Sequence, residues 1–517
     1  MMLNISDAEN LLKKYFNYSH FRENQEKVIN NIIHNNNNML VIMPTGGGKS
    51  ILYTIPALLF NGLTIIVSPL IALMQDQVLN LKARNINAEY ISSEDNNLDK
   101  IKDNIDKIKL LFISPERFVN EKFFIWLKTL NIEFIALDEA HTFTEYGLSF
   151  RASYRNFFLK LNEFKKIKKI KFMALTATAS EFIYNDLTNN YNFEKVFKFN
   201  TFRDNLNIEI KLFETEKEKE IELYSVLTEK ETTLIYTLSR RSSEKIYYRN
   251  GEKFKKLRYY HAKLPSNIKK EILKGFINDK IKIISSTTAF GMGIDKSNVR
   301  FVYHSELPSS IEDYAQQIGR AGRDGKSSDV IMYISRKNIE ERKKIIYNNK
   351  ENLKKELKNL EKGKITEKDS IKNIFLIRNL ITPLKKPVLE INILSDLTSY
   401  PFLNNLLKLL KNENNIKKIS KKLNVKQWII EDSLEYLQDR ENIEYKLKKY
   451  QINNFNFEEE LKYLYKDDDI KIRKFESMLD FINTKKCRHV WLGDYFNNQI
   501  EECKTICDNC RIKEEKT

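Results

Sequence analysis

The sequence predicts an α/β protein with two parallel-sheet domains in tandem, followed by a helical region and a small metal-binding module. Short apolar runs alternate with helix-like segments over residues 38 to about 200, and the alternation restarts near residue 205. Strands that alternate with helices favour a parallel sheet covered on both faces. Beyond residue 336 the pattern becomes charged and helical, and all four cysteines lie between residues 487 and 510.

The first two domains are expected at residues 1–203 and 204–340, each with five apolar runs that we interpret as buried strands. In the first domain these are residues 39–43, 64–68, 109–114, 134–138 and 171–175. In the second domain they are residues 231–238, 257–261, 280–286, 299–304 and 329–334.

The third region, residues 341–470, is expected to be helical. Apolar residues at helical spacing occur at 416–423 and again at 430–437, with a turn between them and a strand-like exit at 443–445. Helix, turn, helix and strand is the layout of a winged-helix unit. A plain helical hairpin fits the same pattern equally well.

Composition restricts the class of protein. The net charge of +17 and the pI of about 9.2 favour a polyanionic partner, nucleic acid first, although a general bias toward Lys and Asn would also raise the charge. The chain contains no apolar run of membrane-spanning length, and Asp7 and Glu9 lie where a secretory signal would be basic and apolar. We therefore expect no membrane association and a cytoplasmic protein, associated with the nucleoid if the source is prokaryotic.

A glycine-rich turn at residues 43–50 lies between a predicted strand and a helix-like segment. Such a turn points successive backbone N–H groups at a phosphate, and the helix N-terminus adds partial positive charge. We expect Lys49 to reach the β and γ phosphates and Ser50 to hold Mg²⁺, although Met43 lies where the general pattern has glycine. The nucleotide-binding candidates in this turn are Thr45, Gly46, Gly47, Gly48, Lys49 and Ser50.

Two adjacent carboxylates, Asp138 and Glu139, follow the apolar run at 134–136. They would lie at the carboxyl end of a strand, where open α/β sheets bind ligands. We expect Asp138 to hold Mg²⁺, usually through water, and Glu139 to orient and deprotonate an attacking water. With a Lys-Ser turn upstream, the pair indicates nucleotide hydrolysis.

The last region, residues 471–517, contains a predicted helix at 473–482, with Phe475, Met478 and Ile482 facing inward. Four thiols within two dozen residues are suited to tetrahedral binding of Zn²⁺, and a site whose four ligands are all cysteine is structural. Four free thiols are the alternative. The predicted ligands are Cys487, Cys503, Cys507 and Cys510.

In this order, the motifs resemble those of the RecQ family of superfamily 2 DNA helicases. The match covers about residues 10–335 almost continuously and returns at 470–510. By this resemblance the two tandem domains are RecA-like, the nucleotide is ATP, Arg22 and Gln25 contact its adenine, and Arg117 lies among the DNA contacts. Further segments similar to family motifs are residues 16–25, 68–77, 113–117 and 174–179.

Residues 142–154 resemble the aromatic-rich loop of the family, which senses single-stranded DNA and reports it to the ATP site. Bases stack on aromatic faces, and an arginine contacts phosphate or base. Two positions depart from the family pattern: Tyr146 replaces a usual tryptophan and Leu148 a usual histidine. The DNA-binding candidates that match the family are Phe150, Arg151 and Tyr154.

Residues 290–295 and 316–325 resemble the diagnostic motifs of the family's second domain. Charge that develops on the transferred phosphoryl group requires a cation from across the cleft. We expect Arg323 to be this arginine finger with Arg320 beside it, whereas Gln317 departs from a usual glutamate. The second-domain candidates are Gln316, Arg320, Arg323 and, near the ribose, Asp295.

The resemblance implies a monomeric ATP-dependent DNA helicase that requires ATP, Mg²⁺ and Zn²⁺ and acts in recombination and repair. It would move 3′ to 5′ on single-stranded DNA and open tailed or forked duplexes. The family's zinc module usually follows the second domain closely, whereas here about 150 residues intervene. A translocase that does not separate strands therefore remains an alternative. An RNA helicase and a non-enzymatic DNA-binding scaffold are further alternatives.

Overall fold

The computed structural model describes residues 4–44, 46–69, 71–91, 98–142, 151–177, 179–200, 203–288, 290, 296–361, 418, 443–446, 449–452 and 457–515. Contacts divide the chain into two units. The larger unit consists of Met1–Gly147, Ser153–Arg336 and Met478–Thr517, and the smaller of Leu148–Ala152 and Lys337–Ser477. Within the described ranges, no helix combines the length and apolar character that crossing a membrane would require.

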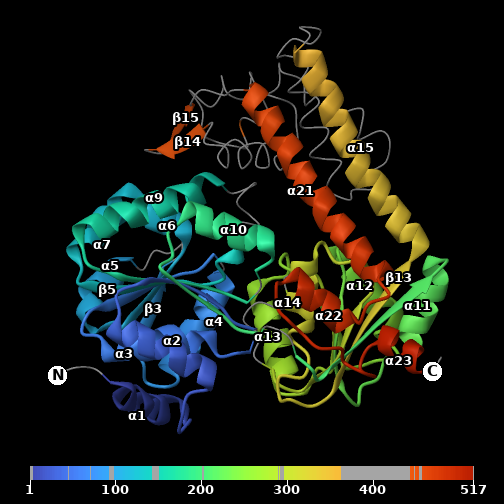
Figure 1. The fold of residues 1–517 in the computed structure, drawn as a ribbon, viewed down its shortest axis with the longest axis horizontal. Coiled ribbons are helices and arrows are strands. Elements are labelled where there is room, and N and C mark those ends of the chain that lie inside the picture. The colour runs from blue at the N-terminus through green and yellow to red at the C-terminus, as the bar shows by residue number, and fades with distance from the viewer. Residues whose placement is uncertain are drawn as a thin grey trace. The chain divides into compact units, whose positions relative to one another are not determined.

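The first sheet of the larger unit has seven strands in the order β3-β4-β2-β5-β6-β1-β7. Figure 1 draws this sheet in blue to teal. Every neighbouring pair is parallel, as the alternation of apolar runs and helices predicts. The strands are β1 (Asn38–Ile42), β2 (Leu63–Val67), β3 (Ala88–Ile91), β4 (Leu110–Ile113), β5 (Ile132–Leu137), β6 (Lys171–Thr176) and β7 (Lys195–Lys198).

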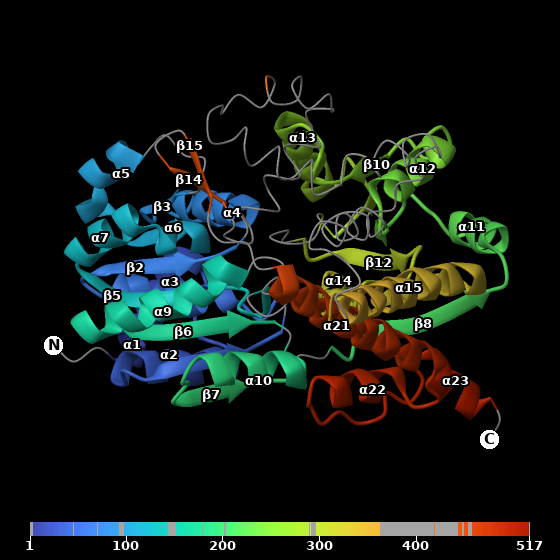
Figure 2. The ribbon, with the colours of Figure 1, turned by 90° about the horizontal axis from the view of Figure 1, so that it is seen from above.

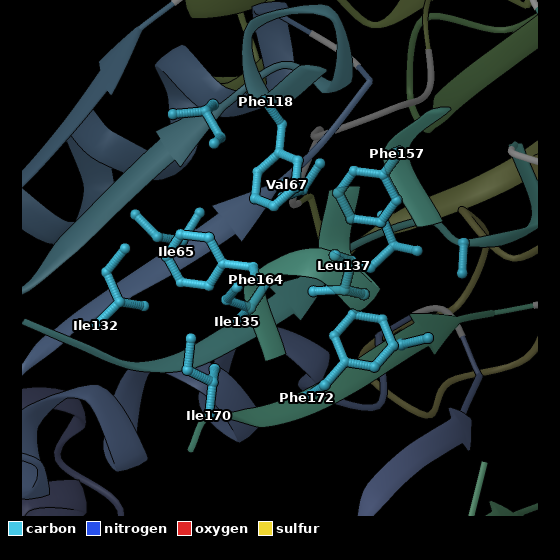
Figure 3. Packing of buried hydrophobic residues seen from close by; sticks show 14 of the residues in the cluster. Ile65, Val67, Phe118, Ile132, Ile135, Leu137, Phe157, Phe164, Ile170 and Phe172 are labelled. Carbon is cyan, nitrogen blue, oxygen red and sulfur yellow. The ribbon is translucent and has the colours of Figure 1, made fainter. Parts of the chain in front are cut away.

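Helices cover both faces of this sheet because side chains alternate along each strand. In β2, Ile65 and Val67 point into one core cluster and Ile66 into the other. The first cluster includes Phe118 and Phe157 (Figure 3). Its helices are α5 (Leu98–Asp103), α6 (Pro115–Val119), α7 (Glu121–Thr129), α9 (Arg151–Ile167) and α10 (Glu181–Asn190). The helices of the second cluster are α1 (Ile5–Phe16), α2 (Glu23–His34), α3 (Lys49–Leu59) and α4 (Ile71–Lys82).

The second sheet has six parallel strands in the order β10-β11-β9-β12-β13-β8. Its strands are β8 (Leu206–Phe213), β9 (Thr232–Tyr236), β10 (Leu257–Tyr260), β11 (Ile283–Ser286), β12 (Val299–His304) and β13 (Ser328–Ser335). Its helices are α11 (Glu216–Ser225), α12 (Arg240–Asn250), α13 (Ser266–Ile277) and α14 (Ile311–Ile318).

The cysteine-containing end of the chain, residues 487–515, packs on the edge strand β8 through α22 (Arg488–Tyr495) and α23 (Asp508–Glu514) (Figure 2). We call this segment the cysteine module. Alternate residues of β8 present their backbone groups to it. Leu206 O accepts from His489 Nε2 at 3.0 Å, Ile208 forms a parallel bridge with Cys507, and Ile210 N donates to Asp508 Oδ2 at 3.1 Å.

The smaller unit contains two long helices, α15 (Arg336–Glu361) and α21 (Phe457–Asn483), each of which ends in the larger unit. They run antiparallel, because Tyr347 on α15 donates to Glu476 at 2.6 Å and Lys350 pairs with Asp469. A short hairpin of β14 (Ile443–Lys446) and β15 (Lys449–Ile452) begins at the predicted strand-like exit. Apart from residue 418, the predicted winged-helix unit at 416–437 lies outside the described residues.

The predicted fold class is confirmed: two parallel-sheet domains, a helical region and a four-cysteine module follow one another along the chain. The helix before the first cysteine is also confirmed, and it is longer than predicted. Its residues Phe475, Met478 and Ile482 are buried, as their spacing indicates.

Candidate active site

The phosphate turn, which we define as residues 44–48, joins β1 to α3. Gly46 and Gly48 have φ angles of +77° and +80°, a backbone region that glycine enters without strain. A Cβ atom on Gly48 would lie 2.3 Å from Gln25 Nε2, so the turn is also too crowded there for a side chain. The predicted glycine turn between strand and helix is therefore present, with Lys49 and Ser50 in the first turn of α3.

Arg22 and Gln25, the predicted adenine contacts, lie directly on the phosphate turn. Arg22 Nη1 donates to Gly46 O at 3.1 Å, and Gln25 Nε2 donates to Gly47 O at 3.0 Å. The two residues are tied together, because Gln25 Oε1 accepts from Arg22 N at 3.1 Å. The start of α2 thus supports the turn, and contact with adenine stays a prediction.

The acidic pair, Asp138 and Glu139, comes directly after β5, which is the neighbour of β2 in the first sheet. Lys49 Nζ lies 3.7 Å from Glu139 Oε1, so the lysine that follows the phosphate turn and the predicted base form an ion pair. Glu139 has a φ angle of +51°, a left-handed conformation that costs a non-glycine residue energy. Asp138 Oδ1 accepts from the backbone N–H of Glu139 at 3.0 Å, which fixes the first carboxylate beside the second.

The two carboxyl groups have opposite pKa shifts. Burial, reinforced by Glu139, raises the pKa of Asp138 well above its ordinary value. Burial also acts to raise the pKa of Glu139, but Lys49, His141 and Arg320 outweigh it and hold that pKa below its ordinary value. Glu139 is therefore the carboxylate that stays ionised, as a general base must, while Asp138 has the environment in which a bound cation would restore ionisation.

His141 was not among the candidates from the sequence, yet it links two motifs. Its Nδ1 lies 3.0 Å from Thr176 Oγ1 and 3.4 Å from Glu139 Oε2. Thr176 ends β6 and belongs to the segment 174–179 that resembles the family's coupling motif. The position of His141 two residues after Glu139 was a weak signal, because its partner is 35 residues away in the sequence.

Arg320 and Arg323 lie just after α14, in residues 319–323, which we call the arginine loop. Arg320 is buried, and burial together with Arg323 lowers its pKa to about 10. The negative charge of Glu139 acts in the opposite direction and offsets part of this lowering of the Arg320 pKa. An arginine whose charge is disfavoured in this way fits a site that receives an anion.

Gln317 replaces the usual family glutamate, and it forms a buried pair with His304 on β12. The distance from Gln317 Oε1 to His304 Nε2 is 2.9 Å. Burial lowers the pKa of His304 to about 3, so the ring is neutral and its Nε2–H donates to the amide oxygen. The departure from the family pattern therefore produces a neutral hydrogen bond three residues before Arg320.

Other predicted residues are placed less fully. Thr45, Phe150 and Asp295 lie outside the described residues. Arg151 and Tyr154 lie within the first turns of α9, with their side chains outside the described part. Arg117 N donates to Ser114 Oγ at 3.4 Å, and the Arg117 guanidinium lies 5.9 Å from the Phe123 ring. Gln316 lies on α14 and is partly exposed.

The four cysteines form a cluster whose Sγ atoms all lie within 4.8 Å of one another. Backbone N–H groups point at two of the sulfurs: Arg488 N lies 3.4 Å from Cys507 Sγ, and Cys503 N lies 3.4 Å from Cys487 Sγ. Four thiolates with such donors suit Zn²⁺. Three residues lie between Cys503 and Cys507 in the sequence, yet their Sγ atoms belong to the same cluster. The donor set therefore fits a structural metal.

Three family models match the chain. A DEAD/DEAH box helicase model covers residues 22–185, a helicase conserved C-terminal domain model covers residues 216–325, and a RecQ zinc-binding model covers residues 437–511.

The chain is similar to curated helicases over about two thirds of its length. The ATP-dependent DNA helicase RecQ of Bacillus subtilis is 38% identical over 341 residues, which cover 64% of this chain and 57% of that protein. The probable ATP-dependent DNA helicase RecS of Bacillus subtilis is 30% identical over 336 residues, covering 63% of this chain and 67% of that protein. The chain belongs to the RecQ family of superfamily 2 helicases.

This RecQ-family chain spans little more than half the length of several relatives, such as 53% of the Haemophilus influenzae ATP-dependent DNA helicase RecQ, which is 35% identical. Its fold is shared more widely. The DEAD-box helicase Mss116 bound to single-stranded RNA aligns with a TM-score of 0.55 at 18% identity, covering 85% of this chain and 90% of that one. At this identity the likeness shows the fold alone.

Proposed function

We propose that this RecQ-family chain is an ATP-dependent DNA helicase that couples ATP hydrolysis to 3′-to-5′ movement on single-stranded DNA and to strand separation. The observation that carries the proposal is the charge arrangement around Glu139. Lys49, directly after the phosphate turn, forms an ion pair with it, and Arg320 of the arginine loop acts electrostatically on the same carboxylate. Charged groups of both parallel-sheet domains therefore act on the carboxylate beside which a phosphoryl group would be transferred.

Each residue has a role that its position supports. Glu139, held ionised, accepts the proton of the attacking water. Lys49 and the N–H groups of the phosphate turn bind the phosphate chain, and Arg323 with Arg320 offsets the charge that develops during transfer. Mg²⁺, when bound by Ser50 and Asp138, would supply further charge neutralisation at the phosphates.

Coupling to DNA follows from what surrounds the acidic pair. Thr142, the first residue of the aromatic-rich segment, donates from Oγ1 to Glu139 O at 2.7 Å. A strand bound by Phe150, Arg151 and Tyr154 can thus shift the backbone that places Glu139, and Arg117 would hold the phosphates of the same strand. Alternate closing and opening of the two domains around the nucleotide would then produce stepping.

The cysteine module supports this activity structurally in our proposal. Zn²⁺ bound by Cys487, Cys503, Cys507 and Cys510 would supply folding free energy to a segment that is too short to bury a large core of its own. The module packs on β8, so the metal would stabilise the second domain. We expect the enzyme to act as a cytoplasmic monomer.

Strand separation on tailed duplexes tests the proposal. We expect ATP-dependent opening of a duplex with a 3′ single-stranded tail, and none with a 5′ tail. Absence of DNA-stimulated ATP hydrolysis would refute the helicase assignment. Hydrolysis stimulated by single-stranded DNA without opening of either duplex would instead favour a translocase, and equal stimulation by RNA would favour an RNA helicase.

A further inference from the structure

Arg203 lies in the segment that joins the two sheets, between β7 and β8, and its guanidinium contacts both sides of the nucleotide site. Its Nη1 donates to Ala321 O at 2.8 Å, between Arg320 and Arg323. Its Nη2 lies 2.7 Å from the point that a Cβ on Gly46 would occupy. One side chain therefore bridges the arginine loop and the phosphate turn.

Positive charge gathers around Gly46. Two carbon atoms of the Arg323 side chain lie 3.7 Å from the point that a Cβ on Gly46 would occupy. Arg22 Nη1 donates a hydrogen bond to Gly46 O at 3.1 Å. Burial, with Arg323 and Arg22, lowers the pKa of Arg203 to about 10. Guanidinium groups this close repel one another unless an anion lies among them, and a polyphosphate chain accepts several of their N–H groups at once.

The neighbouring Asn205 holds the arginine loop from the same segment. Its Nδ2 donates to Gly322 O at 2.9 Å and to Lys326 O at 2.8 Å. A Cβ on Gly322, which has a φ angle of +57°, would come within 2.4 Å of this amide. The linking segment therefore fixes two successive carbonyl groups of the loop, Ala321 and Gly322, and sets where Arg323 can reach.

We propose that Arg203 is a further phosphate-binding residue, which contacts the terminal phosphate of a bound nucleoside triphosphate and so distinguishes it from the diphosphate. The assignment rests on the proposed function, because it adds a residue to the same site. The terminal phosphate is the expected partner because Arg203 is hydrogen-bonded to the arginine loop. Arg323 of that loop is the residue assigned to the transferred phosphoryl group. Loss of that phosphate would release the bridge between phosphate turn and arginine loop.

Equilibrium binding of fluorescent nucleotides to the full chain tests this inference. For Arg203→Ala we expect affinity for a non-hydrolysable ATP analogue to fall about 10- to 100-fold, the effect of one charge-assisted hydrogen bond, while affinity for ADP stays nearly unchanged. Arg203→Lys keeps the charge but lacks the planar guanidinium, so its affinity for the ATP analogue should lie between those of the wild type and Arg203→Ala. Arg336→Ala is the control: Arg336 pairs with Glu214 at the surface, where its side chain is 62% exposed, and both affinities should be unchanged.

Unchanged binding of the ATP analogue, or an equal loss for the analogue and ADP, would overturn the terminal-phosphate role. If Arg203→Ala lowers the thermal midpoint far below that of the wild type, the analogue-to-ADP affinity ratio of Arg203→Lys decides, since a purely structural role leaves that ratio unchanged. A wild-type chain that binds neither nucleotide would refute the proposed function and this inference together. A wild type that binds both, with an unaltered Arg203→Ala variant, would refute this inference alone.

Discussion

The backbone at Glu139 is in a left-handed conformation, and this one residue combines the functions of the site. It lies two residues after the end of β5, contacts Lys49 and His141, and carries the carboxylate whose pKa is held low. Strained non-glycine residues persist where the surroundings over-determine them, commonly at active sites. A left-handed Glu139 aims its side chain at the phosphate turn.

Glu139→Gln should separate nucleotide binding from hydrolysis. The amide keeps the shape of the side chain but cannot accept the proton of water, so we expect hydrolysis to fall on the order of 10²- to 10⁴-fold with ATP still bound. Steady-state hydrolysis and equilibrium binding measure the two effects. Lys49→Ala provides the contrast, because it should weaken binding as well; a Glu139→Gln chain that hydrolyses normally would contradict the base assignment.

His304 gives a pH dependence whose sign can be worked out. Its pKa falls from 6.5 to about 3 on folding, chiefly by burial, so the unfolded chain takes up the proton first. Stability from this group is complete above about pH 6.5 and is lost as the pH falls toward 3, at about 1.4 kcal/mol per pH unit.

Urea unfolding at about pH 7 and about pH 5 tests this dependence. The wild type should lose about 2 kcal/mol more than His304→Gln, whose amide can still donate to Gln317 but does not titrate. The rings that face His304 are those of Tyr236 and Tyr314, and both tyrosines stay neutral over this range. Equal losses in the two proteins would contradict a buried neutral His304.

The residues whose roles could be predicted from the sequence have local signals. Lys49, Asp138 and Glu139 follow apolar strands at spacings that phosphate chemistry requires. His141 and Arg203 could not be predicted, because their partners, Thr176 and Ala321, are distant in the sequence and are brought to them only by sheet order.

At the scale of elements, the central strands were predictable and most edge strands were not. Every apolar run named from the sequence is a strand, and the strands not named, β3, β7, β8 and β15, all lie at sheet edges. Central parallel strands are buried on both faces and read as continuous apolar runs. Edge strands such as Lys195–Lys198 carry polar residues where they face solvent or a covering segment.

The cysteine module should lose metal and stability together. Cys510→Ser removes one of four thiols in the cluster, so we expect less than one bound Zn²⁺ per chain and a lower thermal midpoint. Metal analysis and thermal unfolding of the same samples check both. Cys510→Ser with wild-type metal content, or a metal-free wild type of equal stability, would contradict a structural zinc site.

Asp508→Asn is a useful companion variant. Asp508 accepts hydrogen bonds from Ile210 N and, at 3.0 Å, from Arg488 Nε. It is not one of the four cysteines proposed to bind the metal. We expect it to lower the thermal midpoint through the loss of a buried ion pair, while the bound metal is retained. The two variants separate the contribution of the metal from that of the contact with β8.

At the scale of the whole molecule, the smaller unit is inserted between β13 and the cysteine module. α15 contacts α21 at Tyr347 with Glu476 and at Lys350 with Asp469. Both helices continue for about three turns beyond the second pair. Residues 362–456 connect the end of α15 at Glu361 to the start of α21 at Phe457.

Replacing residues 362–456 by a short Gly/Ser connection should leave the hydrolytic site intact. The residues assigned to hydrolysis belong to the larger unit, so we expect DNA-stimulated ATP hydrolysis and bound Zn²⁺ to remain. We infer that these residues contribute to strand separation, so we expect opening of a 3′-tailed duplex to fall. Hydrolysis and unwinding assays on the same preparation compare the two; loss of hydrolysis would show that these residues support the site.

The docking of the cysteine module on β8 has a consequence for the order of synthesis. Ile210 and Asp508 are 298 residues apart. At ribosomal elongation rates of about 5–20 residues per second, β8 emerges about 15–60 s before the segment that covers it. During that interval the backbone edge of β8 in the nascent chain lacks the segment that covers it. Chaperones that hold nascent chains would therefore be most useful at this edge.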